Sequence, residues 1–297
     1  MSPKFSVVLP TFNRGHLLGH AIQSVLNQSF TNWELWVIDD GSTDNTKDVV
    51  LAFNDDRIHY VFQENSERSV ARNHGISLAS GSYIAFLDSD DGYDKKFLEE
   101  VSRTCGDQYV GMVACSVRLG LSHTAEVVEP QPLNDGESTQ EYVFKQPIGT
   151  PRMVVHKTLF EEYTFDPLLR FGEDRDLWVR MAHKHPIKLA PHALFVEIDH
   201  GERSINVDLD PWRTTKTLLS LKRRGLLTKT RTSVYKQTLG KEYLAACRIA
   251  LKGGNRKNAL HAISLALYYS TKNWKFKFNV FLSLLLCKET DSILRLF

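Results

Sequence analysis

The sequence predicts an α/β fold with a mostly parallel sheet flanked by helices, followed by an α-helical extension at the C-terminal end. Short apolar runs alternate with stretches of helical periodicity over the first hundred residues, as in a doubly wound sheet. Aspartates directly follow two of these runs, at Asp39 and Asp88, where the carboxyl edge of a parallel sheet would lie. After Pro211 the composition changes to Leu, Lys, Arg and Ala at helical spacing.

The region from residue 5 to residue 101 is predicted to hold alternating strands and helices. The strands are short apolar runs, and each is followed by a segment in which apolar residues recur at helical spacing. Leu17, Leu18, Ile22, Val25 and Leu26 form one such stripe. Strands are predicted at 5–9, 35–38, 58–62 and 83–87, and helices at 16–26, 46–53, 69–78 and 94–101.

Residues 107–210 carry less regular signals and are expected to complete the same domain. One helix is predicted to begin near Glu173. The segment Glu129–Gly136 contains two prolines, Asn, Asp and Gly, which favour a loop. Strands are predicted at 110–117, 153–156, 187–190 and 194–198.

The extension, residues 211–297, is predicted to be helical. Residues 241–251 and 257–269 have helical periodicity and flank Gly253, Gly254 and Asn255, a pattern typical of a helical hairpin. The hairpin is similar to one unit of a tetratricopeptide array, but such repeats need neighbours on which to stack.

Charge is distributed unevenly between these two parts of the chain. The composition, 42% apolar and 24% charged, is that of a globular protein. Residues 1–210 hold 19 Lys and Arg against 32 Asp and Glu, whereas residues 211–297 hold 18 against 3. The basic extension indicates an anionic partner, such as lipid headgroups or a polyanion. A solvated helical surface that offsets the acidic body is the alternative.

Several functional classes are disfavoured by absent patterns. The four cysteines are widely spaced, so neither a zinc site nor a disulfide framework is indicated, and we interpret them as reduced thiols in the cytoplasm. No secretory signal and no apolar run of membrane-spanning length is evident. Neither a dinucleotide fingerprint after the first strand nor a P-loop occurs, which disfavours the chemistries that those motifs support.

Asp39 and Asp40 follow the second predicted strand and open the run Gly41, Ser42, Thr43. One interpretation is structural, because Asp commonly caps the helix that follows. The other is recognition of a nucleoside, because an ionised carboxylate accepts hydrogen bonds from a base N–H or from ribose hydroxyls. The residues alone leave both interpretations open.

Asp88, Asp90 and Asp91 follow the fourth predicted strand. Three carboxylates within four residues repel one another unless a cation or hydrogen-bond donors compensate. A divalent cation would do so, since Mg²⁺ and Mn²⁺ favour oxygen ligands and Mg²⁺ typically combines one or two carboxylates with substrate phosphates. A solvated acidic turn is the alternative.

Glu173 and Asp174 open a predicted helix, where acidic residues also serve as ordinary complements to the helix dipole. The functional interpretation is a general base, because a carboxylate held within about 3 Å of a hydroxyl takes its proton as the oxygen attacks. Arg72 is a candidate phosphate or base contact, or else a charge on a helix surface.

Taken together, five motifs in this order resemble those of the family 2 glycosyltransferases, which are inverting, nucleotide-sugar-dependent enzymes of the GT-A fold. The resemblance spans roughly residues 5–205. One departure is Glu67, where many relatives have glycine. The motifs are SVVLPTFN at 6–13, IDDGSTD at 38–44, ARN at 71–73, FLDSDD at 86–91 and GED at 172–174.

The resemblance implies a role for each matching residue. Phe12 would stack on the nucleotide base, with Pro10 and Thr11 beside it. Asp40 would accept from the base N–H and Asp39 would lie next to it. The remaining roles are Asp88 near the ribose, Asp90 as ligand of Mn²⁺ or Mg²⁺, His200 as a further ligand of the metal or diphosphate, Arg72 and Glu173 as donor-binding residues and Asp174 as catalytic base.

The implied reaction is a single displacement that moves a sugar from a nucleoside diphosphate, with UDP as the family tendency, to an acceptor hydroxyl. The implied domain covers residues 1–210, with a nucleotide-sugar half at about 1–106 and an acceptor half at about 107–210. A role in cell-surface polysaccharide or glycolipid synthesis is expected.

Two other functional classes stay open. One is a different metal-dependent enzyme acting on phosphates, and the other is a non-catalytic scaffold that binds a polyanion or membrane. For the extension we predict docking on an anionic membrane at its inner face, through aromatic residues between lysines over 272–281. The same residues could instead pack a helical subdomain or a homodimer. No nucleic-acid partner is expected.

Overall fold

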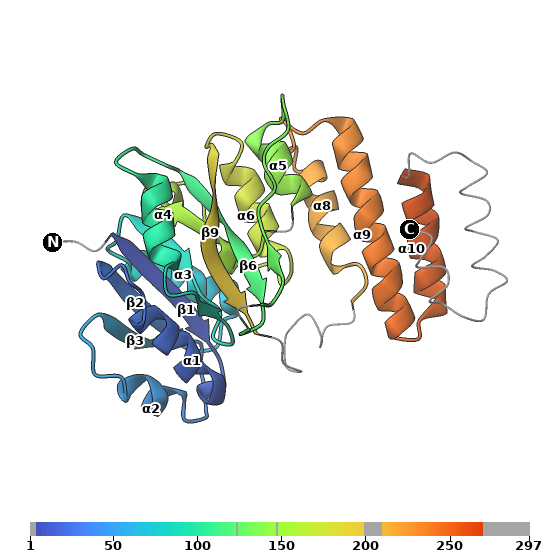
Figure 1. The fold of residues 1–297 in the computed structure, drawn as a ribbon. Helices are drawn as coiled ribbons and strands as arrows, with labels where there is room; N and C mark the ends of the chain where they lie inside the picture. Colours follow the sequence, from blue (N-terminus) through green and yellow to red (C-terminus); the bar gives the residue numbers. More distant parts are fainter. Residues whose placement is uncertain (1–3, 123, 147, 199–209, 270–297) are drawn as a thin grey trace. The chain divides into compact units, whose positions relative to one another are not determined.

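The computed structural model describes residues 4–122, 124–146, 148–198 and 210–269 (Figure 1). The chain divides into two compact units, residues 1–200 and 201–297. The domain boundary expected at residue 210 borders the segment 199–209, outside the described residues, and stays a prediction.

The first half of the larger unit is a parallel sheet in the order β3-β2-β1-β4. Val7 of β1 pairs with Leu35 of β2 on one side and with Ala85 of β4 on the other. The alternation predicted from the sequence is confirmed, with ends moved by one or two residues. The strands are β1 (Phe5–Thr11), β2 (Trp33–Asp39), β3 (Ile58–Phe62) and β4 (Tyr83–Phe86), and the helices between them are α1 (Gly15–Leu26), α2 (Thr46–Leu51) and α3 (Arg68–Leu78).

The second half continues the same sheet as β8-β6-β9-β5, with antiparallel pairs at β4–β8, β8–β6 and β9–β5. The prediction of two strands at 187–190 and 194–198 was wrong, because β9 is one strand. Its pairing with β6 jumps from Cys115–Ala190 to Ser116–Leu194, so Pro191 lies in an irregularity that the strand passes through. These strands are β5 (Gly92–Tyr93), β6 (Met112–Leu119), β8 (Met153–His156) and β9 (Ile187–Glu197), and β7 (Val127–Val128) pairs with β6.

Helices α4 (Phe97–Cys105), α5 (Thr139–Lys145) and α6 (Glu173–Met181) complete this unit, with short 3₁₀ turns at Thr150–Arg152 and Lys157–Glu161. The predicted start of α4 at Asp94 was three residues early. The Asp94 side chain accepts a hydrogen bond from the backbone N–H of Lys96, so Asp94 serves the turn before the helix. The predicted helix at Glu173 is confirmed, whereas α5 was not predicted.

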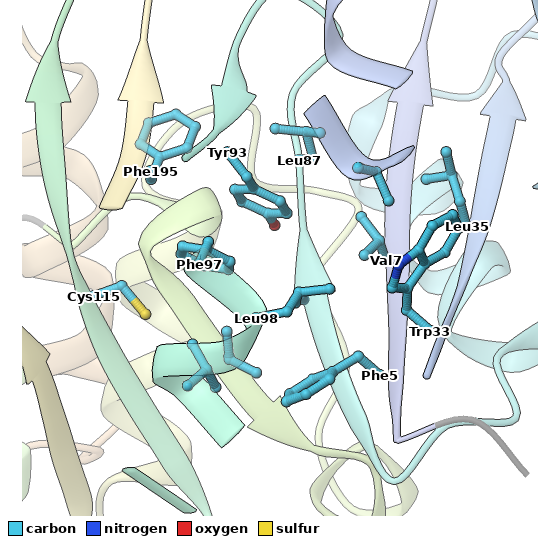
Figure 2. Close-up of a cluster of buried hydrophobic side chains, with 14 of the residues drawn as sticks. Phe5, Val7, Trp33, Leu35, Leu87, Tyr93, Phe97, Leu98, Cys115 and Phe195 are labelled. Carbon is cyan, nitrogen blue, oxygen red and sulfur yellow. The ribbon is translucent and has the colours of Figure 1, made fainter. Parts of the chain in front are cut away.

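One hydrophobic core joins α1 and α4 to the sheet (Figure 2). Leu18, Ile22 and Val25 of α1 are fully buried, and so are Phe97 and Leu98 of α4. Each buried side chain of this size stabilises the fold by about 1.5 to 3 kcal/mol. The packing holds β1 and β4 in place, and the loops that leave their carboxyl ends are therefore attached to rigid elements.

In the second unit, α8 (Arg213–Arg223) precedes a hairpin of α9 (Thr232–Lys252) and α10 (Arg256–Tyr269). The predicted hairpin is confirmed, although α9 begins nine residues before the predicted 241. Small residues such as Ala246, Ala250 and Ala262 let the two helices approach closely. Among the described residues no helix is long and apolar enough to span a membrane. The aromatic and lysine residues over 272–281 lie outside the described part of the chain.

Candidate active site

Three parallel strands bring the predicted site residues to one edge of the sheet. β1 lies between β2 and β4, and all three run in the same direction. The loops that follow them carry Phe12, Asp40 and Asp88, respectively. Because parallel strands end at a common edge, residues separated by up to 76 positions are neighbours in this part of the fold.

Asp39 and Asp40 have different surroundings, although both are buried. Asp39 accepts hydrogen bonds from the Ser42 backbone N–H, at 2.8 Å, and from the Tyr60 hydroxyl, at 2.7 Å. Its two oxygens therefore hold the turn after β2. Asp39 does not cap the helix that follows, because Thr46, the first residue of α2, donates its N–H to Asp44 instead.

Asp40 accepts from the Ser66 N–H at 2.9 Å and from Gln63 Nε2 at 2.7 Å, both at Oδ1. Since both bonds go to Oδ1, the second oxygen, Oδ2, retains the capacity to accept a hydrogen bond from a ligand.

The residues that end β1 differ sharply in exposure. Thr11 is buried, and its hydroxyl has no hydrogen-bond partner in the described part of the chain. The large apolar side chain of Phe12 is 46% exposed. Pro10 is partly buried within β1. An exposed ring beside Asp40 suits stacking on a planar ligand, whereas Thr11 faces the protein.

Arg72 of α3 connects two of the predicted site segments. Its Nη2 donates to Asp88 Oδ1 and its Nη1 donates to Glu173 Oε1, both at 3.0 Å. The Arg72 side chain is only 4% exposed, so the alternative of a helix-surface charge was wrong. Burial alone would lower the pKa of Arg72, but Asp88 and Glu173 raise it above its ordinary value. Arg72 therefore stays charged and ties the end of β4 to the start of α6.

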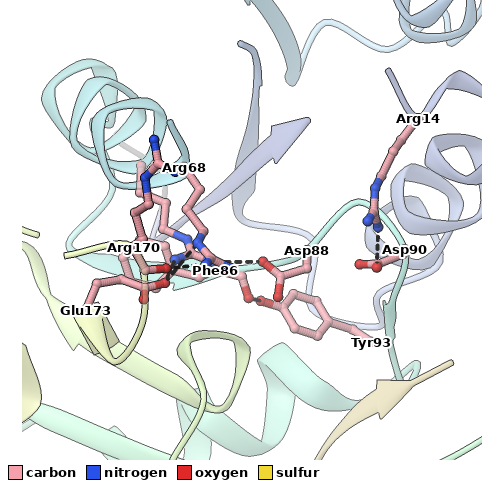
Figure 3. A network of polar contacts seen from close by, with 9 residues as sticks. Arg14, Arg68, Phe86, Asp88, Asp90, Tyr93, Arg170 and Glu173 are labelled. Atoms are coloured by element: carbon pink, nitrogen blue, oxygen red, sulfur yellow. Dashed lines mark hydrogen bonds and ion pairs between the residues drawn. The ribbon is translucent and has the colours of Figure 1, made fainter. Parts of the chain in front are cut away.

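A second arginine joins this network from the same helix. Arg68 lies one turn before Arg72, and its Nε is 3.3 Å from Glu173 Oε1. Its guanidinium also lies 5.3 Å from the centre of the Phe171 ring. Glu173 is thus held between two cations of α3, as Figure 3 shows for Arg68 and Glu173.

The three clustered carboxylates after β4 each have their own partner. Asp88 pairs with Arg72, Asp90 pairs with Arg14 of the loop before α1, and Asp91 accepts from the Ile198 N–H at 2.8 Å. Figure 3 shows Asp88 and Asp90 pointing toward different partners. The chain itself therefore supplies the compensation for which the sequence analysis invoked a divalent cation, and charge repulsion alone does not require one.

The donor set around Asp90 is nonetheless compatible with Mn²⁺ or Mg²⁺. Asp88 and Asp90 offer carboxylate oxygens on one loop, and such ions commonly bind through one or two carboxylates with the remaining ligands from substrate phosphates and water. The described residues hold no group of three or more potential metal-ligating side chains. His200, the other predicted ligand, lies outside the described residues.

Asp174 occupies the first turn of α6 beside Glu173. Burial and the neighbouring charge of Glu173 raise the pKa of Asp174 to about 6, against the opposing effects of the Arg175 backbone N–H and of Arg175 and Arg72. The N–H of Arg175 donates to Asp174 Oδ1 at 2.6 Å. A carboxylate with this pKa is ionised at neutral pH and is a much stronger base than an ordinary aspartate.

The loop before α3 has an unusual backbone conformation at residue 67, where many relatives have glycine. Glu67 has φ 77° and ψ 155°, a backbone conformation that is essentially reserved for glycine. Its carboxylate lies 3.7 Å from Arg170 and is largely exposed. The fold thus keeps the glycine-type geometry at the start of the helix that carries Arg68 and Arg72.

Sequence reasoning missed Arg14, Arg68 and Gln63, which contact Asp90, Glu173 and Asp40, respectively. A usable signal existed for Arg14, because it directly follows the PTFN segment at a predicted strand end. Arg68 could have been found from its spacing of four residues before Arg72 on the same helix.

The model of the family described as "Glycosyl transferase family 2" matches residues 6–163. Over 178 residues the chain is 47% identical to UDP-Glc:alpha-D-GlcNAc-diphosphoundecaprenol beta-1,3-glucosyltransferase WfgD of Escherichia coli, a match that covers 59% of this chain and 68% of that protein. The chain spans 31% to 46% of the length of three further relatives, which come from two Rickettsia species and Bacillus subtilis.

Solved structures share the fold at low sequence identity. S. aureus TarS 1-349 superposes with a TM-score of 0.65 at 17% identity, over 90% of this chain and 81% of that one. The mannosyltransferase PcManGT from Pyrobaculum calidifontis, solved with GDP-Man and Mn2+, gives a TM-score of 0.61 at 18% identity, over 100% of this chain and 84% of that one. The GT-A-type fold expected from the sequence is confirmed.

Proposed function

We propose that the chain, which belongs to the family 2 glycosyltransferases, transfers a hexose from a UDP-linked donor to an acceptor hydroxyl with inversion at the anomeric carbon. The observation that carries this proposal is the linked arrangement of Asp88, Arg72, Glu173 and Asp174, which joins the predicted donor site to a carboxylate with a raised pKa. Glycosyl transfer needs both parts, a donor site and a base.

Asp174 is the residue to which we assign the proton transfer. The acceptor hydroxyl becomes a stronger nucleophile as Asp174 takes its proton during attack on the anomeric carbon. A pKa of about 6 lets the carboxylate be ionised at neutral pH while it keeps a substantial affinity for the proton. Single displacement from the side opposite the leaving group gives inversion.

Donor binding is assigned to the ends of β1, β2 and β4. Phe12 would stack on the base, and Asp40 would accept from its ring N–H at Oδ2. Asp88, fixed by Arg72, would meet the ribose. Asp39, Pro10 and Thr11 support the shape of this site, since Asp39 holds the turn and Thr11 is buried.

Asp90 is the residue that would hold a divalent cation, with Asp88 beside it and His200 as a proposed further ligand. When bound, Mn²⁺ or Mg²⁺ supplies positive charge that stabilises the departing diphosphate. Because Asp90 pairs with Arg14, a cation at this position would compete with the Arg14 guanidinium for the carboxylate.

For the acceptor we propose a lipid-linked or surface glycan, by analogy with the diphosphoundecaprenol substrate in the name of WfgD. The protein would then act in the cytoplasm at the inner face of the membrane. The excess of Lys and Arg over residues 211–297 supports peripheral attachment to anionic lipid. Flotation with vesicles tests this: equal recovery with neutral and anionic lipid would contradict it.

A donor screen tests the transferase proposal. Purified protein is incubated with Mn²⁺ and a panel of nucleotide sugars, and release of the nucleoside diphosphate is measured. We expect turnover of a UDP-sugar that is lost in Asp90→Ala and in Asp174→Asn. Asp55→Asn is the matched control, because Asp55 pairs with Arg57 at the surface, away from the site. Turnover that survives in Asp174→Asn would refute the assigned base.

A further inference from the structure

A cleft of about 510 Å³ lies on the α1 side of the sheet. Gly92 and Tyr93 of β5 form what we call its floor, and one wall is α1 with His20, Gln23 and Asn27. The other wall comes from β6, β9 and the loop after β6. The volume is in the range of pockets that bind small molecules. None of the residues assigned to the donor, the metal or the base lines this cleft.

Arg118 of β6 is the feature that gives the cleft a chemistry. Its side chain is 9% exposed, and its Nη1 donates to Asp94 Oδ2 at 3.1 Å. Its Nε is buried and has no hydrogen-bond partner among the described residues. A buried N–H without an acceptor is costly, and an anion in the cleft reaches this one when the Arg118 side chain turns its Nε edge toward the opening. The edge of a guanidinium that carries Nε fits phosphate or carboxylate through two parallel hydrogen bonds.

The other charges around the cleft favour an anion. Lys95 contributes a second cation, and Asp94 is the acidic group in contact with Arg118. The balance of these three residues is one positive charge. On α1, Gln23 Nε2 donates to Asn27 Oδ1 at 3.0 Å, and the remaining amide atoms, Gln23 Oε1 and Asn27 Nδ2, can bond to hydroxyls. Leu121, 58% exposed, adds an apolar surface.

We propose that this cleft binds a sugar that carries an oxyanion, phosphate or carboxylate, with the anionic group on Arg118 and Lys95 and the hydroxyls on the amides of α1. This ligand is separate from the donor, and the cleft is the second saccharide site of the protein. Gly92 follows Asp90 by two residues, so the cleft adjoins the loop of the catalytic centre. The statement that this ligand is an acidic or phosphorylated unit of the acceptor rests on the proposed function. The statement that the cleft binds a sugar with an oxyanion does not.

The backbone of Gly92 contributes to the shape of the floor. A Cβ at this position would lie 3.0 Å from His20 Cε1, closer than side chains normally approach. The absence of a side chain therefore keeps His20 beside the floor and leaves the cleft open between α1 and β5. Gly92 pairs with Val196 of β9, so the floor is part of the sheet and is rigid.

The test is binding measured by calorimetry on the full chain, with UDP and Mn²⁺ present to fill the donor site. The probes are glucose 1-phosphate, glucuronate, glucose and inorganic phosphate. We expect one of the two charged sugars to bind, and which of them binds identifies the anion. Glucose and inorganic phosphate should each bind at least about tenfold more weakly, because each lacks half of the contacts.

Variants locate the site. Arg118→Gln should weaken binding by about tenfold or more, and Lys95→Ala by a smaller factor, while Lys96→Ala, the neighbouring exposed lysine outside the cleft, should leave it unchanged. Leu121→Trp should block the cleft without touching a buried residue, which keeps the test valid if Arg118→Gln fails to fold. No binding of either charged sugar, binding unaffected by Leu121→Trp and Arg118→Gln, or equal binding of inorganic phosphate would each overturn the proposal. None of these outcomes bears on the donor screen.

Discussion

The pKa of Asp174 makes a prediction about the pH dependence of the reaction. Only the ionised carboxylate can take a proton, so kcat/KM should rise with pH and level off above the pKa of about 6. About 9% of the carboxylate is ionised at pH 5, half at pH 6 and about 97% at pH 7.5. An unperturbed aspartate, with its pKa near 3.8, would give almost no dependence over this range.

Glu173→Gln separates the causes of that pKa. Glu173 raises the pKa of Asp174 by its charge, and Gln removes the charge while its amide oxygen still accepts from Arg72. Arg72 and Arg175 continue to lower the pKa of Asp174, and Glu173 no longer opposes them. We expect the midpoint of the acidic limb to move down by about one pH unit. Glu162→Gln, at an exposed pair with Lys184, is the matched control and should move nothing.

Unfolding in urea gives an independent readout of the same shift. The folded pKa lies above the unfolded value of 3.8, so the folded state binds more protons between pH 4 and 6, and stability falls as pH rises through this window. The cost of ionised Asp174 is complete above pH 6. Asp174→Asn should therefore stabilise the protein at pH 7.5 by about 1 to 3 kcal/mol, and by almost nothing at pH 4. An acidic limb that stays at the same pH in Glu173→Gln, together with no stabilisation by Asp174→Asn, would refute this reasoning.

Three further predictions concern the arginines and Glu67. Arg72→Met should destabilise the fold by about 3 kcal/mol in urea unfolding, because it leaves buried Glu173 without its closest cation. Lys184→Met, at an exposed pair, should cost much less, and equal effects would contradict the bridging role. Arg14→Gln should tighten Mn²⁺ binding without nucleotide by about fivefold in calorimetry, since Asp90 no longer pairs with a guanidinium, and unchanged or weaker binding would exclude that competition. Glu67→Gly should raise the unfolding free energy by about 1 kcal/mol because it removes the strained φ of 77°, and a lower melting temperature would show that the contact to Arg170 matters more.

Much of the fold could be predicted because its elements bury continuous apolar runs. β1, β2 and β4 are covered on both faces, so their sequences are almost uninterrupted apolar segments with clear ends. The elements that were missed are short or depend on distant partners. β5 has two residues and exists because Gly92 and Tyr93 pair with β9, about a hundred positions away. No local pattern encodes such a pairing.

The site could be predicted as a set of residues but not as a set of contacts. The acidic residues stand at strand and helix ends, and those positions follow from the apolar runs before them. Their partners do not, because Arg14 and Arg72 are distant in sequence from the residues they pair with, and an arginine in a helix is most often a surface charge. For the same reason the sequence favoured a metal as the compensation for the negative charges of Asp88 and Asp90, although arginines provide it.

Arg72 has a role that neither the carboxylates nor the motif ARN would indicate alone. It pairs with Asp88, the residue we assign to the ribose, and with Glu173, whose charge raises the pKa of Asp174. It also acts on Asp174 directly and lowers that pKa. Burial and Glu173 raise the pKa of Asp174, and Arg72 lowers it. Asp174 is therefore a stronger base than a surface aspartate and is still ionised at neutral pH. Because the same guanidinium fixes Asp88, a change in Arg72 should alter donor affinity and the pH profile together, whereas a change in Glu173 should alter mainly the pH profile. This difference distinguishes a cation that couples the two halves of the site from one that only stabilises the fold.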